Sequence, residues 1–522
     1  MYFHKLIELL FISGVIVEIN SYRILGVFPM NSRSHNNMFD PLMKGLAKRG
    51  HKIDVISHFE LKNPPDNYRT IINLHGTRHD LTNNISVEHA SQIGHDPIIH
   101  ISTTYGNEFC ELMNLEEFQK IIKNPIHHYD LIITEAFSSN CYIGLGYVLK
   151  APVITVSTLL DFPWVSDAMG NPSSTAFATN VFMDKAFVTT FFDRLKSTFI
   201  HHHTKYRFNK LTDKIQTEAM RKYLSPDMPN VREVERSVAL MFTNYHHTLY
   251  GPKPFTSAVI PIGGIHAEQN DDQFTPELKQ WMDKTTHGVI YFSLGSMILI
   301  ESLPKDTLLA FYASFAKVAP IKVLIKVPNK DKLPLGLPKN VMTSPWIPQI
   351  PVLKHKNTKV FITHGGLMGT MEALYNGVPL IGLPFFSDQQ PNMEIYVKKN
   401  MAILLDPKTI NEKKITDALN SILTDPKYRE AAKRESLLFR DRPMSILDTA
   451  NFWVEYVIRN GPNCLRSPAV DLYWWQVELL DVYAFILISF IIVIYLFVFF
   501  IKKMVKILNN SLKNSQNSKK NK

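Results

Sequence analysis

The sequence predicts an α/β fold with two Rossmann-type units, each a parallel sheet covered by helices, and one C-terminal transmembrane helix. Strand–helix–strand patterns at residues 23–57 and 360–383 indicate the two units. The uncharged apolar run Val482–Ile501 indicates the transmembrane helix. A chain of 522 residues, 45% of them hydrophobic, is long enough for two domains with separate cores.

The first unit begins directly after an N-terminal apolar segment. The run RILGVF at Arg23–Phe28 is typical of a buried strand, and an amphipathic helix is predicted from His35 to Arg49. Gly50 ends this helix, and KIDVIS at Lys52–Ser57 is the second strand. Further strands are predicted at Asp130–Thr134 and Val153–Val156.

The second unit follows a stretch rich in proline and glycine, Gly251–Gly264, which is the predicted linker. Its strands are predicted at Gly288–Ser293, Lys322–Ile325, Val360–Ile362 and Leu380–Leu383. Helical patterns follow at residues 413–422, 428–439 and 439–461.

Both ends of the chain carry membrane signals. Residues 1–21 have a basic start at Lys5 and an apolar run from Leu6 to Ile19, which is typical of a secretory signal peptide. An N-terminal anchor is the alternative, but this run is short for a span. Val482–Ile501 would cover roughly 30 Å as a helix, which matches a bilayer core. Lysines follow it and Asp481 precedes it, so the positive-inside rule predicts a cytosolic tail and a lumenal body.

Charge and cysteine content exclude two kinds of site. The net charge is +10, but seven lysines and no acidic residue lie at residues 502–522. The basic balance therefore describes the tail, and no nucleic-acid partner is expected. The three cysteines, Cys110, Cys141 and Cys464, permit at most one disulfide and have no metal-ligand spacing; three thiols are the favoured interpretation.

Residues 346–392 hold the densest pattern of glycine and polar residues. An apolar strand runs into His364, Gly365 and Gly366, and a short helix follows to Asn376. Two glycines at such a turn let the backbone approach an anion closely, and the helix N-terminus offers N–H donors with a partial positive charge. The pattern therefore predicts a diphosphate site.

Other side chains near this turn suit the remaining parts of a nucleotide sugar. Trp346 offers a flat face for a base, and Gln349 can form hydrogen bonds with a base edge. Glu372 can accept from both hydroxyls of a ribose. Asp388 and Gln389 can bind sugar hydroxyls.

This segment resembles the signature of the UDP-glycosyltransferases. The match comprises WxPQ, HGG, the Glu-Ala of MEA, GVP and the DQxxN that ends at Asn392. It extends upstream to FSLGS at Phe292–Ser296 and IGGIH at Ile262–His266, and the insect-type membrane-bound branch is the most similar. The resemblance implies the glycosyltransferase-B fold, with two domains facing across a cleft. It also implies that residues 439–461 cross back to the first domain, and that the donor is contacted by Ser296, His364, Gly366 and Gly369.

These observations divide the chain into seven parts. They are a signal peptide (1–21), an N-terminal acceptor-binding domain (22–250), a linker (251–264), a C-terminal UDP-sugar-binding domain (265–438), C-terminal helices with a juxtamembrane segment (439–481), the transmembrane helix (482–501) and a basic cytosolic tail (502–522).

The first domain is expected to supply the catalytic base. His35 follows the first strand at a helix start, where the carboxyl edge of a parallel sheet places ligands. Its ordinary pKa suits proton transfer near neutrality. From position alone, a solvated helix cap is the commoner role of such a histidine. The resemblance implies the base, because Ser34 and His35 match the family's serine–histidine pair.

Two positions depart from the family pattern. The carboxylate that would orient the base is an aspartate in the family, and the matching position here is Glu135, one methylene longer. A solvated acid at the end of a strand is the alternative for Glu135. Vertebrate members often carry asparagine where this chain has Met368, so one polar contact to the nucleotide is absent or replaced.

The resemblance implies inverting, metal-independent transfer of a hexose from a UDP-sugar to hydroxyl groups of small lipophilic acceptors, as in detoxification. The insect-type similarity favours glucose over glucuronic acid. No Asp-X-Asp triplet occurs, so no metal is expected, and no cofactor is expected besides the donor substrate. The alternatives are a transferase for sterol or lipid acceptors, or a UDP-sugar-binding membrane protein with impaired catalysis. A homo-oligomer is left open.

The expected location is the endoplasmic reticulum membrane, as a single-pass type I protein. The final residues, Lys519 to Lys522, resemble a dilysine retrieval signal, which a lysine-rich tail can also match by chance. Asn84, followed by Ile85 and Ser86, is the only glycosylation sequon in the predicted lumenal part. We therefore expect glycosylation at Asn84 if the body is lumenal.

Overall fold

The structure is a computed structural model that describes residues 21–520 except 80, 126, 161, 180, 184, 270 and 271. All of the predicted signal peptide apart from Ser21 lies outside the described residues, as do the last two residues of the retrieval signal. The chain divides into two units, Met1–Ser467 and Pro468–Lys522. Each unit is described by itself below.

The first unit contains two parallel sheets, and the N-terminal one has seven strands. Their order across the sheet is β3-β2-β1-β4-β5-β6-β7. The strands are β1 (Arg23–Phe28), β2 (Lys52–Ser57), β3 (Tyr68–Asn73), β4 (Leu131–Glu135), β5 (Val153–Ser157), β6 (Leu240–Thr243) and β7 (Val259–Pro261). β7 pairs with β6 and lies inside the predicted linker 251–264, so the first domain continues into that segment.

The second sheet has six strands in the order β10-β9-β8-β11-β12-β13. They are β8 (Val289–Ser293), β9 (Lys322–Lys326), β10 (Val341–Ser344), β11 (Thr358–Thr363), β12 (Leu380–Gly382) and β13 (Ala402–Leu404). Strands such as β4 and β8 are buried at every position, because helices cover both faces of a parallel sheet. This burial explains why their sequences are apolar runs without alternation.

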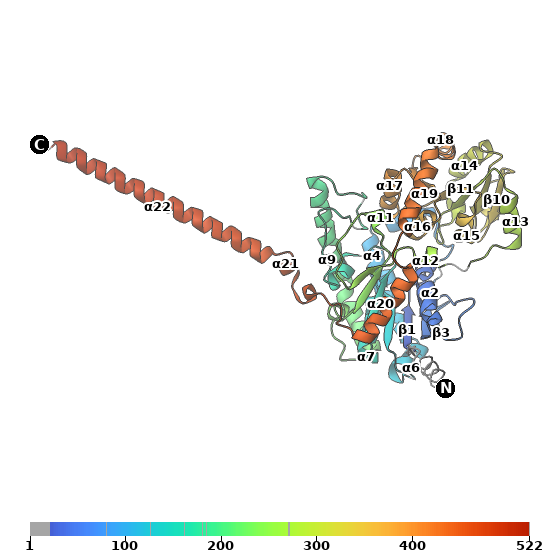
Figure 1. Ribbon diagram of the computed structural model, residues 1–522, viewed down its shortest axis with the longest axis horizontal. Helices are drawn as coiled ribbons and strands as arrows, with labels where there is room; N and C mark the ends of the chain where they lie inside the picture. The colour runs from blue at the N-terminus through green and yellow to red at the C-terminus, as the bar shows by residue number, and fades with distance from the viewer. Residues whose placement is uncertain are drawn as a thin grey trace, which may run out of the picture. The chain divides into compact units, whose positions relative to one another are not determined.

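The longer helices of the first unit lie between and after these strands (Figure 1). They are α2 (Arg33–Lys48), α3 (Val87–His95), α6 (Glu116–Lys123), α9 (Phe191–Tyr223), α13 (Pro276–Lys284), α14 (Lys305–Lys317), α16 (Leu367–Tyr375), α17 (Gln389–Lys398), α18 (Glu412–Thr424), α19 (Pro426–Arg440) and α20 (Ile446–Asn460).

Each sheet reverses its strand order at one place, between β1 and β4 in the first and between β8 and β11 in the second. Loops leave the carboxyl ends of such neighbouring strands in opposite directions and open a crevice there. The predicted base and the predicted phosphate turn both follow strands at these places, β1 and β11. The topology therefore agrees with the predicted position of a ligand site in each domain.

Helix α20 returns from the second domain to the first. Its buried residues Ile446, Ala450 and Val454 share a core cluster with Met38 and Leu42 of α2. Figure 1 shows α20 lying beside α2. The last helix of the unit therefore joins the two domains through apolar packing.

Cys110 and Cys141 form a disulfide, so the interpretation of three thiols was wrong. The two residues are 31 positions apart in the chain, at the end of α5 (Glu108–Cys110) and near the start of η3 (Asn140–Gly144). Both are fully buried. Only the packing of these two helices brings the sulfurs together, and no local spacing indicates it.

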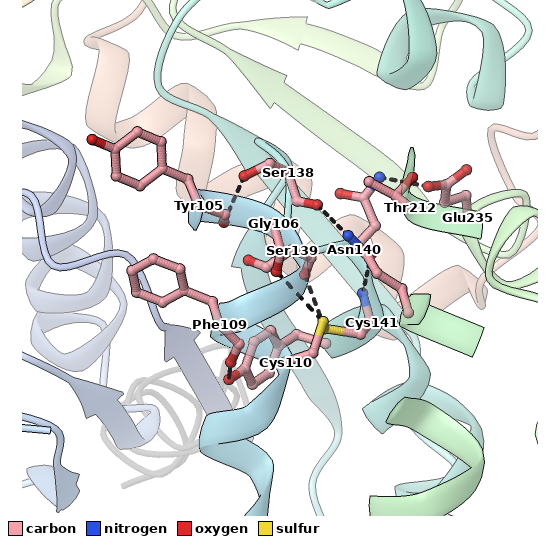
Figure 2. The surroundings of a disulfide bond; sticks show 12 residues. Tyr105, Gly106, Phe109, Cys110, Ser138, Ser139, Asn140, Cys141, Thr212 and Glu235 are labelled. Atoms are coloured by element: carbon pink, nitrogen blue, oxygen red, sulfur yellow. Dashed lines mark hydrogen bonds between the residues drawn. A yellow bond between two sulfur atoms is a disulfide. The ribbon is translucent and has the colours of Figure 1, made fainter. Parts of the chain in front are cut away.

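Figure 2 shows the disulfide joining the segment that holds Tyr105 and Phe109 to the segment that holds Ser138 and Ser139. Beside the bridge, the Ser138 hydroxyl donates a hydrogen bond of 2.7 Å to the carbonyl of Tyr105. Residues 105–110 are thereby fixed to residues 137–141. Tyr105 and Phe137 line the cavity described below, so the bridge stabilises one of its walls.

The second unit consists mainly of one long helix, α22 (Leu480–Lys520). Its span Leu480–Asn517 has a stretch of mean hydropathy 3.1 and is the one helix of the described residues long and apolar enough to cross a membrane. The side chains of Val482–Ile501 are exposed or nearly so, as the predicted lipid-facing segment requires.

Candidate functional site

A cavity of about 260 Å³ opens between the carboxyl edges of the two sheets. Residues of both domains line it. From the first domain it includes His35, and from the second it includes all nine predicted donor residues: Ser296, Trp346, Gln349, His364, Gly366, Gly369, Glu372, Asp388 and Gln389. One cavity therefore holds the predicted base and the predicted donor site.

His35 lies in the first turn of α2 and contacts Glu135 at the end of β4. Its Nδ1 is 2.5 Å from Glu135 Oε1. The Thr158 hydroxyl, just beyond β5, donates to the same carboxylate oxygen at 2.9 Å and lies 3.1 Å from Nδ1. The extra methylene of glutamate therefore does not prevent the pair from forming.

This contact decides which nitrogen of His35 can act as a base. The Glu135 side chain is only 2% exposed and accepts a hydrogen bond from the N–H at Nδ1, which leaves the lone pair on Nε2. The His35 side chain is 13% exposed, and its ring packs edge-on against Phe137. A buried carboxylate behind a partly exposed imidazole is an arrangement that can take a proton from a hydroxyl in the cavity.

His364 follows β11 and is packed between two glycines. A Cβ added to Gly366 would lie 2.5 Å from its Nε2, and a Cβ added to Gly295 would lie 2.6 Å from its Cε1. Burial, helped by the charge of Lys326, lowers the pKa of His364 to about 4. The ring is therefore neutral at pH 7 and can offer an N–H donor but no charge.

The helix after the glycine turn starts facing the cavity. Gly366 is the N-cap of α16 and has no side chain with which to cap it. The N-terminus of a helix carries a partial positive charge and attracts anions. Together with His364, it makes this side of the cavity suitable for a diphosphate.

The residues predicted to bind the nucleoside form a hydrogen-bonded chain. Gln349 donates from Nε2 to Glu372 Oε2 at 2.6 Å and accepts at Oε1 from the Tyr291 hydroxyl at 3.1 Å. Burial raises the pKa of Glu372 to about 7. Trp346 lies near these hydrogen-bonded residues, and 48% of its surface is exposed. One flat face of its ring is therefore open to a base.

The predicted sugar-binding pair lies at the start of α17. Asp388 accepts a hydrogen bond of 2.6 Å from Asn392, and burial raises the pKa of its carboxyl group. Gln389 accepts from the backbone N–H groups of Phe385 and Phe386, so its carbonyl oxygen holds this loop. Its Nε2 makes no hydrogen bond among the described residues and can donate into the cavity.

Met368 connects the two domains. Its Sδ accepts a contact of 3.4 Å from Asn244 of the first domain, and its carbonyl accepts from His266 Nε2 at 3.1 Å. The position that is often asparagine in vertebrate members is thus used for domain contact here. Its side chain offers no polar group to the nucleotide.

The sequence reasoning missed two polar residues of the site, Thr158 and Lys326. Thr158 lines the cavity and completes the His35–Glu135 contact, and Lys326 lines its donor side. Each stands at or just beyond the carboxyl end of an apolar strand, β5 or β9. That position is the signal that would have found them, because ligands bind at this edge of parallel sheets.

Asn84 lies outside the cavity and is exposed. Its side chain is 2.7 Å from His79 Nε2. Among the described residues, no three histidine, cysteine, aspartate or glutamate side chains are grouped as a metal ion would need. Independence from metal stays a prediction.

Comparisons with known proteins agree with this geometry. A family model described as "UDP-glucoronosyl and UDP-glucosyl transferase" matches residues 27–515. The chain is similar to UDP-glucosyltransferase 2 of Dactylopius coccus, with 35% identity over 100% of this chain and 99% of that protein. It is also similar to the ecdysteroid UDP-glucosyltransferase of Spodoptera littoralis nuclear polyhedrosis virus, with 28% identity over 87% and 91% of the two chains.

Among solved structures, the chain resembles the glycosyltransferase VinC in complex with dTDP. The TM-score is 0.55 at 16% identity, over 84% of this chain and 100% of that one. At this identity the likeness concerns the fold alone, which is two facing Rossmann-like domains.

Proposed function

Because the chain belongs to the UDP-glycosyltransferase family, we propose that it transfers glucose from UDP-glucose to a hydroxyl group of a small lipophilic acceptor, with inversion at the anomeric carbon. The two domains have the glycosyltransferase-B fold. One observation carries the proposal: His35, hydrogen-bonded to Glu135, faces the same cavity as the His364–Gly366 turn. A base from one domain and an anion site from the other, in one cavity, are what direct sugar transfer requires.

The proposed reaction is one displacement. His35 Nε2 takes the proton of the acceptor hydroxyl, and the oxygen forms a bond to the anomeric carbon. The bond from that carbon to the phosphate oxygen breaks, and UDP leaves with the bonding pair. Glu135 stabilises the imidazolium that forms, and His364 with the N-terminus of α16 stabilises the charge on the departing diphosphate. No metal takes part in this scheme.

The acceptor side of the cavity supports a lipophilic substrate. Apolar or aromatic side chains of the first domain line the cavity beside its polar ones: Met30, Ile101, Tyr105, Phe137 and Leu159. Such side chains bind a ligand by burial of its apolar surface, and the polar groups among them, such as His35 and Thr158, can orient its hydroxyl group. Detoxification of such compounds is the role we propose.

A donor–acceptor screen tests this function. The full-length protein in vesicles is incubated with UDP-glucose or UDP-glucuronic acid and a mixed panel of phenols, sterols and lipids, and products are identified by mass. We expect glucosides of phenols. Glucosides of sterols alone would support the alternative that the ecdysteroid enzyme's name suggests. UDP binding without any glycoside would indicate impaired catalysis instead.

We also propose that the body lies in the lumen of the endoplasmic reticulum and is anchored by α22. The Cys110–Cys141 disulfide supports an oxidising compartment for the body. The lysines that follow residue 501 support a cytosolic tail, since positive residues are retained on that side. The signal peptide and the retrieval signal are part of the same proposal.

Glycosylation of Asn84 tests this topology. Since Asn84 is exposed, we expect treatment with an N-glycosidase to lower the apparent mass of the wild type but not of Asn84→Gln. Asn509, in a second sequon within the tail, is the matched control: Asn509→Gln should leave the shift intact. A shift that depends on Asn509, or a body digested by protease from the cytosolic side, would contradict the topology.

A further inference from the structure

A segment of the first domain crosses the cleft and pairs with the second domain. We call residues 82–87 the strap. The backbone N–H of Asn83 donates to the carbonyl of Ser296 at 2.8 Å, and that of Ile85 donates to the carbonyl of Met297 at 3.0 Å. Ile85 thus forms a β-bridge to the loop that follows β8. The strap therefore holds the backbone of Ser296, a predicted donor contact.

Apolar contacts anchor the strap on the second domain. Ile85 and Ile93 are 3% and 8% exposed and form a small cluster with Met297 and Phe386. Both Met297 and Phe386 line the cavity. The strap is thus packed into the donor side of the site and does not lie loosely over it.

The side chain of Asn83 reaches the ammonium group of Lys326. Lys326 ends β9, is 5% exposed, and donates from Nζ to Asn83 Oδ1 at 2.6 Å and to the carbonyl of Gly295 at 2.7 Å. A lysine ammonium has three N–H donors, so one is left over. Nζ also lies 5.1 Å from the centre of the Trp346 ring.

Lys326 lacks a negative partner in the described part of the chain. No described carboxylate lies within ion-pair distance of Nζ. Glu301 acts on the Lys326 charge only as a more distant negative charge, without a direct contact. Burial lowers the pKa of Lys326 to about 8, with Glu301 acting in the opposite direction. A buried cation without a counter-ion is costly, which indicates that a ligand supplies the charge.

In the described part of the second domain, no other side-chain cation lines the cavity and could pair with a diphosphate. His364 is neutral at pH 7, because its pKa is lowered to about 4. Among the described second-domain residues that line the cavity, Lys326 is the only lysine or arginine. It stands between Trp346, the expected platform for the base, and His364 at the phosphate turn.

We propose that Lys326 is a donor-binding residue whose charge pairs with the diphosphate of the nucleotide sugar, and that the strap positions it through Asn83. That the ligand is a UDP-sugar rests on the proposed function. The contact with Lys326 involves only the nucleoside diphosphate part of that ligand. Donor affinity then depends on the first domain, although the donor residues belong to the second.

Binding of UDP, with uridine as a competitor, tests the pairing without sugar, acceptor or turnover. Lys326→Met is expected to raise the Kd of UDP at least about tenfold and to leave that of uridine within about twofold, because uridine has no phosphate. Lys326→Arg should restore most of the UDP affinity. Lys322→Met is the matched control: it removes the lysine at the other end of β9, whose Nζ lies over Trp281, and should change neither Kd.

The positioning role of the strap has its own variant. Asn83→Gly removes the acceptor for Lys326 and tolerates the positive φ of 54° at this residue. We expect it to raise the KM for UDP-glucose about threefold to tenfold, with kcat and the acceptor KM little changed. A loss of kcat alone, or no change at all, would contradict the positioning role.

Proton uptake by the wild type provides a test that needs no variant. Pairing with a diphosphate should raise the pKa of Lys326 above its value of about 8, so at about pH 8.5 the free lysine is partly neutral and the bound lysine is charged. UDP phosphates are already ionised at this pH. Calorimetry in two buffers of different protonation enthalpy should therefore show net proton uptake, which Lys326→Met removes.

Equal UDP affinity of a folded Lys326→Met variant and the wild type, or an equal loss of uridine and UDP affinity, would overturn the pairing. Absence of proton uptake by the wild type would overturn it as well. If the wild type bound UDP with these signatures but formed no glycoside, the proposed function would fail and the role of Lys326 would stand.

Discussion

Replacing His35 by alanine is expected to lower kcat about 10²- to 10⁴-fold, because it removes the imidazole that is paired with Glu135 and would take the proton of the acceptor hydroxyl. The Kd of UDP should stay within about twofold, since the diphosphate site belongs to the other domain. The two quantities are measured on the same preparation, by steady-state turnover with UDP-glucose and by calorimetry with UDP.

His100→Ala is the control for His35→Ala. His100 also lines the cavity from the first domain but forms no hydrogen bond with a described carboxylate. We expect it to change the acceptor KM and to leave kcat within about tenfold. If His35→Ala retained the turnover of the wild type, the assignment of the base would be wrong.

Glu135→Gln is expected to lower kcat by a similar factor, about 10²- to 10⁴-fold, while the structure stays intact. The amide group of glutamine can donate a hydrogen bond to Nδ1 of His35. This would move the ring proton to Nε2, where the acceptor hydroxyl must bind, and the ring could no longer act as a base. Crystal or solution data on the variant should show the unchanged fold.

Two further variants make the test of Glu135 specific. Glu135→Asp shortens the side chain by one methylene and should reduce kcat less than glutamine does, because the carboxylate remains. Asp130→Asn, directly before the other end of β4, is the matched control: Asp130 accepts a hydrogen bond of 2.7 Å from the backbone N–H of Arg23 and is not among the residues that line the cavity. Equal activity of Glu135→Gln and the wild type would show that Glu135 is a structural acid only.

The donor half of the site could be predicted from the sequence because its residues are close together in the chain. Trp346 to Gln389 cover one strand–helix–strand stretch and the start of the next helix, and this local order alone brings them to one edge of a sheet. Apolar runs also located most strands to within one or two residues. Nearly all positions of these strands are buried on both faces, which makes the pattern clear.

The acceptor half depends on contacts that join distant parts of the chain. His35 and Glu135 are 100 residues apart, and only the pairing of β1 with β4 brings them together. The sequence suggested the pair through a family resemblance, but it could not show whether glutamate would reach. The structure shows that the distance is 2.5 Å.

The features that the sequence did not indicate have a common physical cause. The Cys110–Cys141 bridge, the strand β7 within the linker, and the strap all arise where one segment packs against another that is far away in the chain. Composition and periodicity describe which face of an element is apolar. They do not describe which distant element covers that face.

The anomeric configuration of the product is the most direct measurement of the central claim. That claim is a single displacement in which His35 activates the acceptor on one side of the sugar while UDP leaves on the other. UDP-glucose is an α-linked donor, so nuclear magnetic resonance of the glycoside formed with a simple phenol should show only the β-anomer. An α-linked product, or a mixture of anomers formed by the enzyme, would contradict it.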